Sequence, residues 1–210
     1  MPRLPLIYTH ELPYHITART NNQEWFQLPL REVWNIFTSN LRYINRKFGF
    51  QIHAFVLMNN HYHLIGTCSE NHNLAEVMGV FQTITAKEIN IKSGNINHVY
   101  GKRYRASLIG DQFYYGAALK YVFRNPVTAK LCPKVENWQY STVSSFQLKS
   151  YAKIPISCHY FEKPLVLFEK NLCSWFNDDF YDKDYIKIKQ GLSKSRFKFP
   201  KRSGNLDRFL

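Results

Sequence analysis

Residues 51–67 read QIHAFVLMNNHYHLIGT and contain two runs rich in apolar, β-branched and aromatic residues. The runs Gln51–Leu57 and His61–Thr67 are typical of short strands. Between them, Asn59 and Asn60 suit a tight turn or a bulge, because asparagine tolerates the backbone conformations that such turns need. The stretch therefore predicts a β-hairpin, and the elements that pack against this hairpin are expected in the flanking sequence.

Helical periodicity flanks this hairpin on both sides. From Leu30 onwards, apolar residues recur every three or four positions until Gly49, which is typical of an amphipathic helix that ends at glycine. After the hairpin, Asn73 is a good N-cap and Glu76 occupies the capping-box position. Apolar residues on one face then predict a second helix that runs to about Asn90.

Two more strands and a third helix complete the pattern. Residues 14–19 (YHITAR) and 103–109 (RYRASLI) are typical of strands, and Asp111 caps the helix after the second of them. Since a proline disfavours the α conformation in the residue before it, Pro126 predicts that this helix stops near Asn125. The order β, α, β, β, α, β, α predicts a two-layer α+β domain, with helices on one face of a mainly antiparallel sheet.

Composition narrows the function classes. The 210 residues include 28 Lys and Arg against 15 Asp and Glu, a net charge of +13. This excess favours a polyanionic partner, with nucleic acid first and an anionic membrane surface second. No apolar run approaches the roughly 18 residues that a membrane span needs, so no membrane segment is expected. The four cysteines include no C-x-x-C pair, which favours reduced thiols in a cytoplasmic protein.

The pattern weakens after Ser145, so we predict a main domain over residues 1–146 and a C-terminal extension over 147–210. The last stretch is strongly basic. Its cations are Lys183, Lys187, Lys189, Lys194, Arg196, Lys198, Lys201 and Arg202.

Four polar residues are candidates for chemistry. His61 and His63 alternate on a predicted strand, so both imidazoles project from one face and can share a metal ion. Tyr121 and Asn125 are four residues apart on the third helix and point the same way. Each has a structural alternative: His-x-His also occurs by chance, Tyr121 fits a core stripe, and Asn125 suits a helix end.

Four segments together resemble a known family. They are LMNNHYHLI (57–65), GKRYRASLI (101–109), LKYVFRNPVTAKL (119–131) and WQYSTVSS (138–145). In this order they are similar to the single-tyrosine HUH transposases of insertion sequences, and within these to the REP-associated tyrosine transposases. The resemblance covers residues 14–145. One departure is Asn59, where the family usually has proline, which bears on the rigidity of the turn.

The resemblance implies a ferredoxin-like α+β fold and a role for each candidate. His61 and His63 match the metal-binding histidines, Asn125 matches a third, amide-type ligand, and Tyr121 matches the nucleophile. The implied metal is Mg²⁺ or Mn²⁺. Attack by Tyr121 on a phosphodiester would release a 3′-hydroxyl and leave a 5′-phosphotyrosine, whose energy allows another 3′-hydroxyl to rejoin the strand.

The expected partner is single-stranded or hairpin DNA. Lys102, Arg103, Arg105 and the basic tail are expected to contact phosphates, while Tyr100 and Tyr104 are available to stack unpaired bases. The alternative is that these cations form a solvated face and that the aromatic residues belong to the core. The expected assembly is a monomer or a homodimer, located in the bacterial cytoplasm and at the nucleoid when bound to DNA.

These inferences predict a metal-dependent single-stranded DNA endonuclease and strand transferase. The alternative is a catalytically silent, domesticated protein that binds structured DNA or RNA through the same surface. An RNA-binding ferredoxin-like domain is a weaker alternative, because the sequence contains no run of the RNP type.

Overall fold

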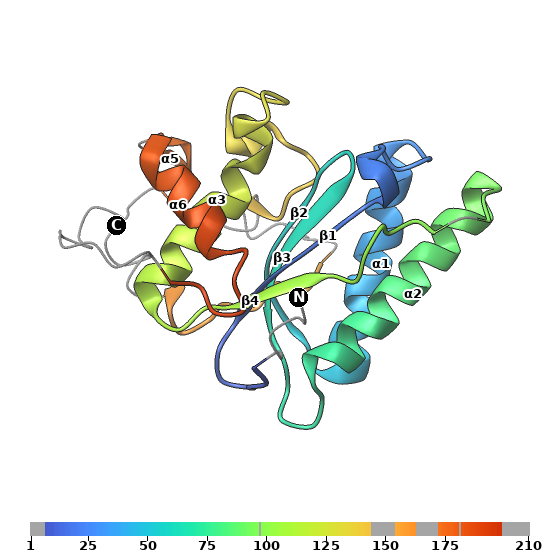
Figure 1. Ribbon diagram of the computed structural model, residues 1–210, viewed down its shortest axis with the longest axis horizontal. Coiled ribbons are helices and arrows are strands. Elements are labelled where there is room, and N and C mark those ends of the chain that lie inside the picture. Colours follow the sequence, from blue (N-terminus) through green and yellow to red (C-terminus); the bar gives the residue numbers. More distant parts are fainter. Residues whose placement is uncertain (1–6, 97, 144–153, 163–171, 181, 199–210) are drawn as a thin grey trace.

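The computed structural model describes residues 7–96, 98–143, 154–162, 172–180 and 182–198 (Figure 1). Its strands are β1 (Tyr14–Arg19), β2 (Gln51–Leu57), β3 (His61–Thr67) and β4 (Arg105–Leu108). Its helices are α1 (Leu30–Phe48), α2 (Leu74–Ser93), α3 (Gln112–Thr128), α5 (Leu172–Asn177) and α6 (Asp182–Gly191), with short 3₁₀ turns η1 (Asn21–Gln23) and η2 (Val135–Asn137). The predicted order of elements is confirmed.

The four strands form one antiparallel sheet in the order β2-β3-β1-β4. With the chain order β, α, β, β, α, β, this is the ferredoxin-like arrangement. The β2–β3 hairpin is closed by a 2.8 Å hydrogen bond from the Met58 amide to the His61 carbonyl. The predicted α+β class and antiparallel sheet are confirmed.

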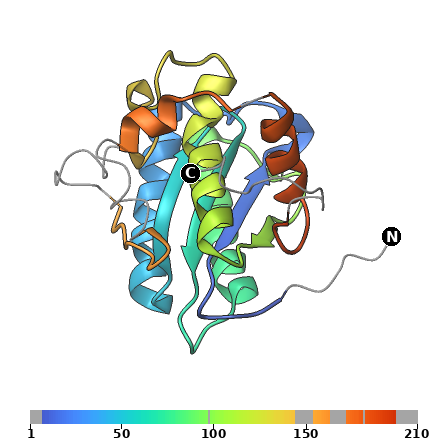
Figure 2. The ribbon, with the colours of Figure 1, turned by 90° about the vertical axis from the view of Figure 1, so that its left-hand side faces the viewer.

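Helices cover both faces of the sheet. One core cluster joins Tyr62 and Leu64 of β3 to α1 and α2, and a second joins Ile65 of the same strand to α3. Figure 2 shows α3 crossing the sheet on the face opposite α1 and α2. The prediction that all helices lie on one face of the sheet is therefore wrong. The reason is that β2 and β3 are buried on both sides, so each face needs its own cover.

The predicted caps are present, but α3 is longer than expected. Gly49 ends α1 with φ 63°, and Asn73 accepts a hydrogen bond from the Glu76 amide at the start of α2. The predicted stop of α3 near Asn125 is wrong, since the helix continues through Pro126 to Thr128. Proline removes one backbone donor, but Ala129 still donates to the Asn125 carbonyl at 2.9 Å and Pro126 itself is buried.

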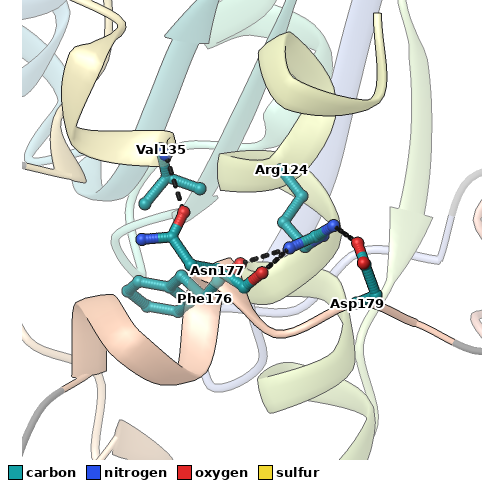
Figure 3. Close-up of polar contacts among 5 residues, drawn as sticks. All are labelled: Arg124, Val135, Phe176, Asn177 and Asp179. Atoms are coloured by element: carbon teal, nitrogen blue, oxygen red, sulfur yellow. Dashed lines mark hydrogen bonds and ion pairs between the residues drawn. The ribbon is translucent and has the colours of Figure 1, made fainter. Parts of the chain in front are cut away.

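The described parts of the C-terminal extension pack directly on α3. Buried Arg124 donates to the carbonyls of Phe176 (3.2 Å) and Asn177, and pairs with Asp179 (Figure 3). The Asn177 side chain in turn accepts a 2.9 Å hydrogen bond from the Val135 amide. The segment after α5 is thereby fixed to α3. The boundary predicted at residue 146 and the tail residues Lys201 and Arg202 lie outside the described residues.

Candidate active site

The two histidines of β3 lie on the sheet face that α3 covers. The rings of His61 and His63 are 5.0 Å apart between centroids and nearly perpendicular. Asn60 donates from its amide nitrogen to the Gln23 carbonyl at 2.6 Å, so its amide oxygen accepts from Nδ1 of His61 at 2.7 Å. Nε2 of His61 therefore carries a lone pair that can ligate a metal.

A third histidine, His15 of β1, completes this cluster and was missed from sequence. Its Nε2 lies 2.9 Å from Nδ1 of His63, and the two rings are stacked with centroids 5.1 Å apart. Burial lowers the pKa of His15 to about 3 and that of His63 well below its usual value, so both rings are neutral. Nε2 of His63 is buried and has no hydrogen-bond partner among the described residues.

The third helix places Tyr121 and Asn125 over these histidines. The Tyr121 ring meets His63 edge-on at 5.6 Å and His15 at 6.1 Å between centroids. The Asn125 side chain donates to the Tyr121 carbonyl at 2.8 Å. Burial is the main cause of the pKa shifts of His63 and Tyr121, since it lowers the pKa of His63 and raises that of Tyr121. The structure thus brings the four predicted residues together.

The nucleophile candidate is covered by a residue of the C-terminal extension. Tyr185 of α6 lies against Tyr121, with ring centroids 5.4 Å apart and an interplanar angle of 30°. Burial raises the pKa of both phenols; the hydrogen bond between them raises the pKa of Tyr121 further and lowers that of Tyr185.

Cations surround the site. Besides burial, which lowers the pKa of His61 to about 4, the charges of Arg19 and Lys189 lower it further. Arg19 also lowers the pKa of Tyr121. Arg105 of β4 is exposed and belongs to the same face, since it stands opposite Thr17 and Thr17 stands opposite His63. These two exposed arginines lie on the same side of the histidines, on β1 and β4, where they can hold a phosphate.

The residues predicted to contact DNA divide into two groups. Lys102 and Arg103 are exposed, as a phosphate contact requires. The stacking role of the two tyrosines is not supported, because Tyr104 is only 5% exposed and belongs to the core. Tyr100 packs against the same cluster and shares a 2.7 Å hydrogen bond with Thr85 of α2.

The sequence does contain a pattern that places His15 and Arg19 together. In YHITAR they stand four residues apart, on the same face of a strand by period-two alternation. The sequence around Tyr185 contains no motif that predicts a role in the site. Tyr185 reaches the site because α6 packs against α3.

Comparison with known proteins gives the family. Residues 8–125 match the family model Transposase IS200 like, which includes β1, the β2–β3 hairpin and α3 as far as Asn125. The chain belongs to the IS200-like transposase family. No curated protein matches this transposase significantly.

Two solved structures match the chain, and the first of them shares its fold. One is the REP-associated tyrosine transposase bound to a REP hairpin, with TM-score 0.60 and 18% identity over 75% of this chain and 93% of that one. The other is a crystal structure of a transposase-like protein from Deinococcus radiodurans, with TM-score 0.41 and 15% identity over 65% of this chain and 98% of that one. Among the described residues, no helix is both long and apolar enough to cross a bilayer.

Proposed function

We propose that this transposase is a metal-dependent endonuclease and strand transferase for single-stranded DNA next to a hairpin, acting through a 5′-phosphotyrosine on Tyr121. The observation that carries this proposal is the packing of Tyr121 edge-on against His63, with Asn125 one turn away on the same helix. A phenol, two neutral imidazoles and an amide in contact are the groups that such a reaction needs.

The donor set fits a divalent metal. His61 presents Nε2 because its Nδ1 is engaged by Asn60, and His63 has a buried Nε2 without a partner among the described residues. The Asn125 amide oxygen is the third donor of this set. No group of three His, Cys, Asp or Glu side chains within the described ranges is arranged as a metal site. Because the set of His61, His63 and Asn125 supplies three donors, it leaves positions for phosphate oxygen and water, as a catalytic Mn²⁺ or Mg²⁺ requires.

When bound there, the metal would polarise the scissile phosphate. The chain's own residues do the rest. Tyr121 gives up its phenolic proton, its oxygen bonds to phosphorus, and the bond from phosphorus to the 3′-oxygen breaks. That oxygen takes up a proton and leaves as the 3′-hydroxyl of one DNA segment, while the other segment stays bonded to Tyr121 through its 5′-phosphate. Arg19 favours the step, since its charge lowers the pKa of Tyr121 against the effect of burial.

Exposed cations near the site favour DNA as the substrate. Arg19 and Arg105 lie beside the histidines on the same sheet face, on β1 and β4, and the chain carries a net charge of +13. The REP-associated transposase that shares this fold was solved with a REP hairpin, which supports a hairpin as the partner here. Binding through phosphates is expected to weaken steeply with salt.

The test is adduct formation. Labelled hairpin oligonucleotides with single-stranded flanks are incubated with protein and Mn²⁺ or Mg²⁺, and a denaturing gel is read for a protein-linked fragment. We expect an adduct that needs metal and disappears in Tyr121→Phe and in the joint His61→Ala, His63→Ala variant. Tyr43→Phe, an exposed tyrosine on α1, is the control and keeps the adduct. Tight binding without any adduct would instead identify a DNA-binding protein that does not cut.

A further inference from the structure

A hollow separate from the candidate active site lies at the end of the sheet where the β2–β3 hairpin turns. Its volume is about 220 Å³, and its walls are the loop after β1, the last turn of α2 and the loop that follows α2. Figure 1 shows the loop after β1 beside that hairpin turn, with the end of α2 farther out on the same side of the molecule. Its polar lining consists of four asparagines, Gln27, Thr20, Glu24 and His98, and Trp25 is the most exposed of its aromatic residues.

Trp25 is an unusually exposed aromatic side chain. Its indole is 71% exposed, whereas its neighbour Phe26 is 7% exposed and packs in the core. The Phe26 amide also donates to the Asn59 carbonyl at 2.9 Å, which anchors the loop to the hairpin. Trp25 is therefore an apolar surface held in place by its neighbour, and such rings serve as stacking platforms for planar ligands.

The loop that forms this wall is bonded to the active site. The Gln23 carbonyl accepts from the Asn60 side chain at 2.6 Å, and Asn60 in turn accepts from Nδ1 of His61 at 2.7 Å. The Gln23 side chain also accepts from Arg19 at 3.1 Å. Asn22 and Gln23 have φ angles of 52° and 62°, a costly backbone conformation that these contacts maintain.

The chemistry of the hollow favours a planar group with polar edges over a phosphate, because its lining includes the acidic Glu24. No lysine or arginine is among the described residues that line it. An adjoining hollow shares Asn90, His98 and Val99 with it and adds Lys102 and Arg103. A pocket of amides with an aromatic ring therefore sits next to a pair of exposed cations. That pairing matches a nucleotide, whose base stacks and bonds through its edge while the phosphate lies outside.

We propose that this pocket binds one unpaired base of a DNA strand, stacked on Trp25 and read by the surrounding amides, with the adjacent phosphate held by Lys102 and Arg103. The proposal rests on the proposed function only in taking DNA as the ligand. Because Gln23 and Asn60 connect the pocket to His61, a base held there helps to fix which phosphodiester reaches Tyr121. The pocket thus supplies part of the sequence preference for the cleavage position.

The first test uses tryptophan fluorescence without metal. Tetranucleotides dA₄, dC₄, dG₄ and dT₄ are titrated into the full chain, and we expect quenching that is lost in Trp25→Phe, although that variant still binds. Trp25→Ala is expected to weaken binding about 5-fold to 100-fold, the usual effect of removing one stacked base contact. Tyr43→Ala, which removes another exposed ring, is the control and binds like the wild type.

A second variant tests reading of the base. Gln27 is exposed, so Gln27→Ala is expected to leave the fold intact and to change the order of affinity among the four tetranucleotides. The proposal is overturned if Trp25→Ala binds all four as tightly as the wild type, or if Gln27→Ala changes nothing. An adduct on Tyr121 with no effect of Trp25→Ala refutes the pocket alone. Quenching by tetranucleotides without any adduct refutes the proposed reaction alone.

Discussion

Replacing His15 with leucine is expected to weaken metal binding although His15 is not a proposed ligand. In the structure, Nε2 of His15 and Nδ1 of His63 are 2.9 Å apart, and burial keeps both rings neutral. One ring must therefore donate and the other accept. If His63 donates from Nδ1, its Nε2 keeps the lone pair that a metal needs.

The size of the effect follows from this one hydrogen bond. Loss of a partner that orients a ligating histidine typically costs about 10-fold to 100-fold in metal affinity. That range corresponds to about 1.4–2.7 kcal/mol of binding free energy. His15→Leu removes the acceptor altogether, so His63 is free to carry its proton on Nε2. His15→Gln keeps an amide oxygen that can accept from Nδ1, and is expected to retain affinity within a few-fold of the wild type.

Two measurements check this prediction. Calorimetric titration with Mn²⁺ gives the affinity of the wild type and both variants. Nitrogen-15 NMR of the metal-free protein gives the tautomer of His63, expected to be protonated on Nδ1 in the wild type and in His15→Gln. Wild-type affinity in His15→Leu, or a wild-type His63 protonated on Nε2, would refute the reasoning.

Three further predictions concern the helix α3 and the buried histidines. Arg124→Met removes two hydrogen bonds from a buried guanidinium to backbone carbonyls, so it should destabilise the fold by about 2–4 kcal/mol and lower Tm by roughly 5–15 °C. Asp179→Asn changes a 90% exposed carboxylate and should cost under about 1 kcal/mol. Equal Tm values for the two variants would contradict this prediction. Tyr185→Phe removes a neighbour that raises the pKa of Tyr121, so the rise of adduct formation with pH should shift to lower pH, and an unchanged or opposite profile argues against the contact. Burial lowers the pKa of His15 to about 3 and that of His53 to about 4, from 6.5 in the unfolded chain, so between these values the two groups bind protons only on unfolding. The free energy of unfolding, measured in urea, should be fully present above pH 6.5 and fall as the pH drops towards 4, by about 1.4 kcal/mol per pH unit for each histidine. A free energy of unfolding that does not change over this pH range would refute the prediction.

The sequence by itself determined the order of the elements and which four residues were candidates for the site, and the family resemblance supplied the role expected of each. Two strand-forming runs joined by asparagines predicted the hairpin. Alternation placed His61 and His63 on one strand face, and helical spacing placed Tyr121 and Asn125 on one helix face. These are local periodicities, set by backbone geometry over a few residues. The same local reasoning failed at Pro126, where burial of the helix outweighed the loss of one hydrogen bond.

Only the tertiary structure decided what surrounds those four residues. His15 meets His63 across 48 positions of sequence, and Tyr185 reaches Tyr121 because α6 packs on α3. The same holds for the burial of Tyr104 and for the helix α3 on the second face of the sheet. Contacts of this kind depend on which surfaces the whole chain buries together. The periodicity of a short stretch shows which of its faces is buried, but not which distant residues pack against that face.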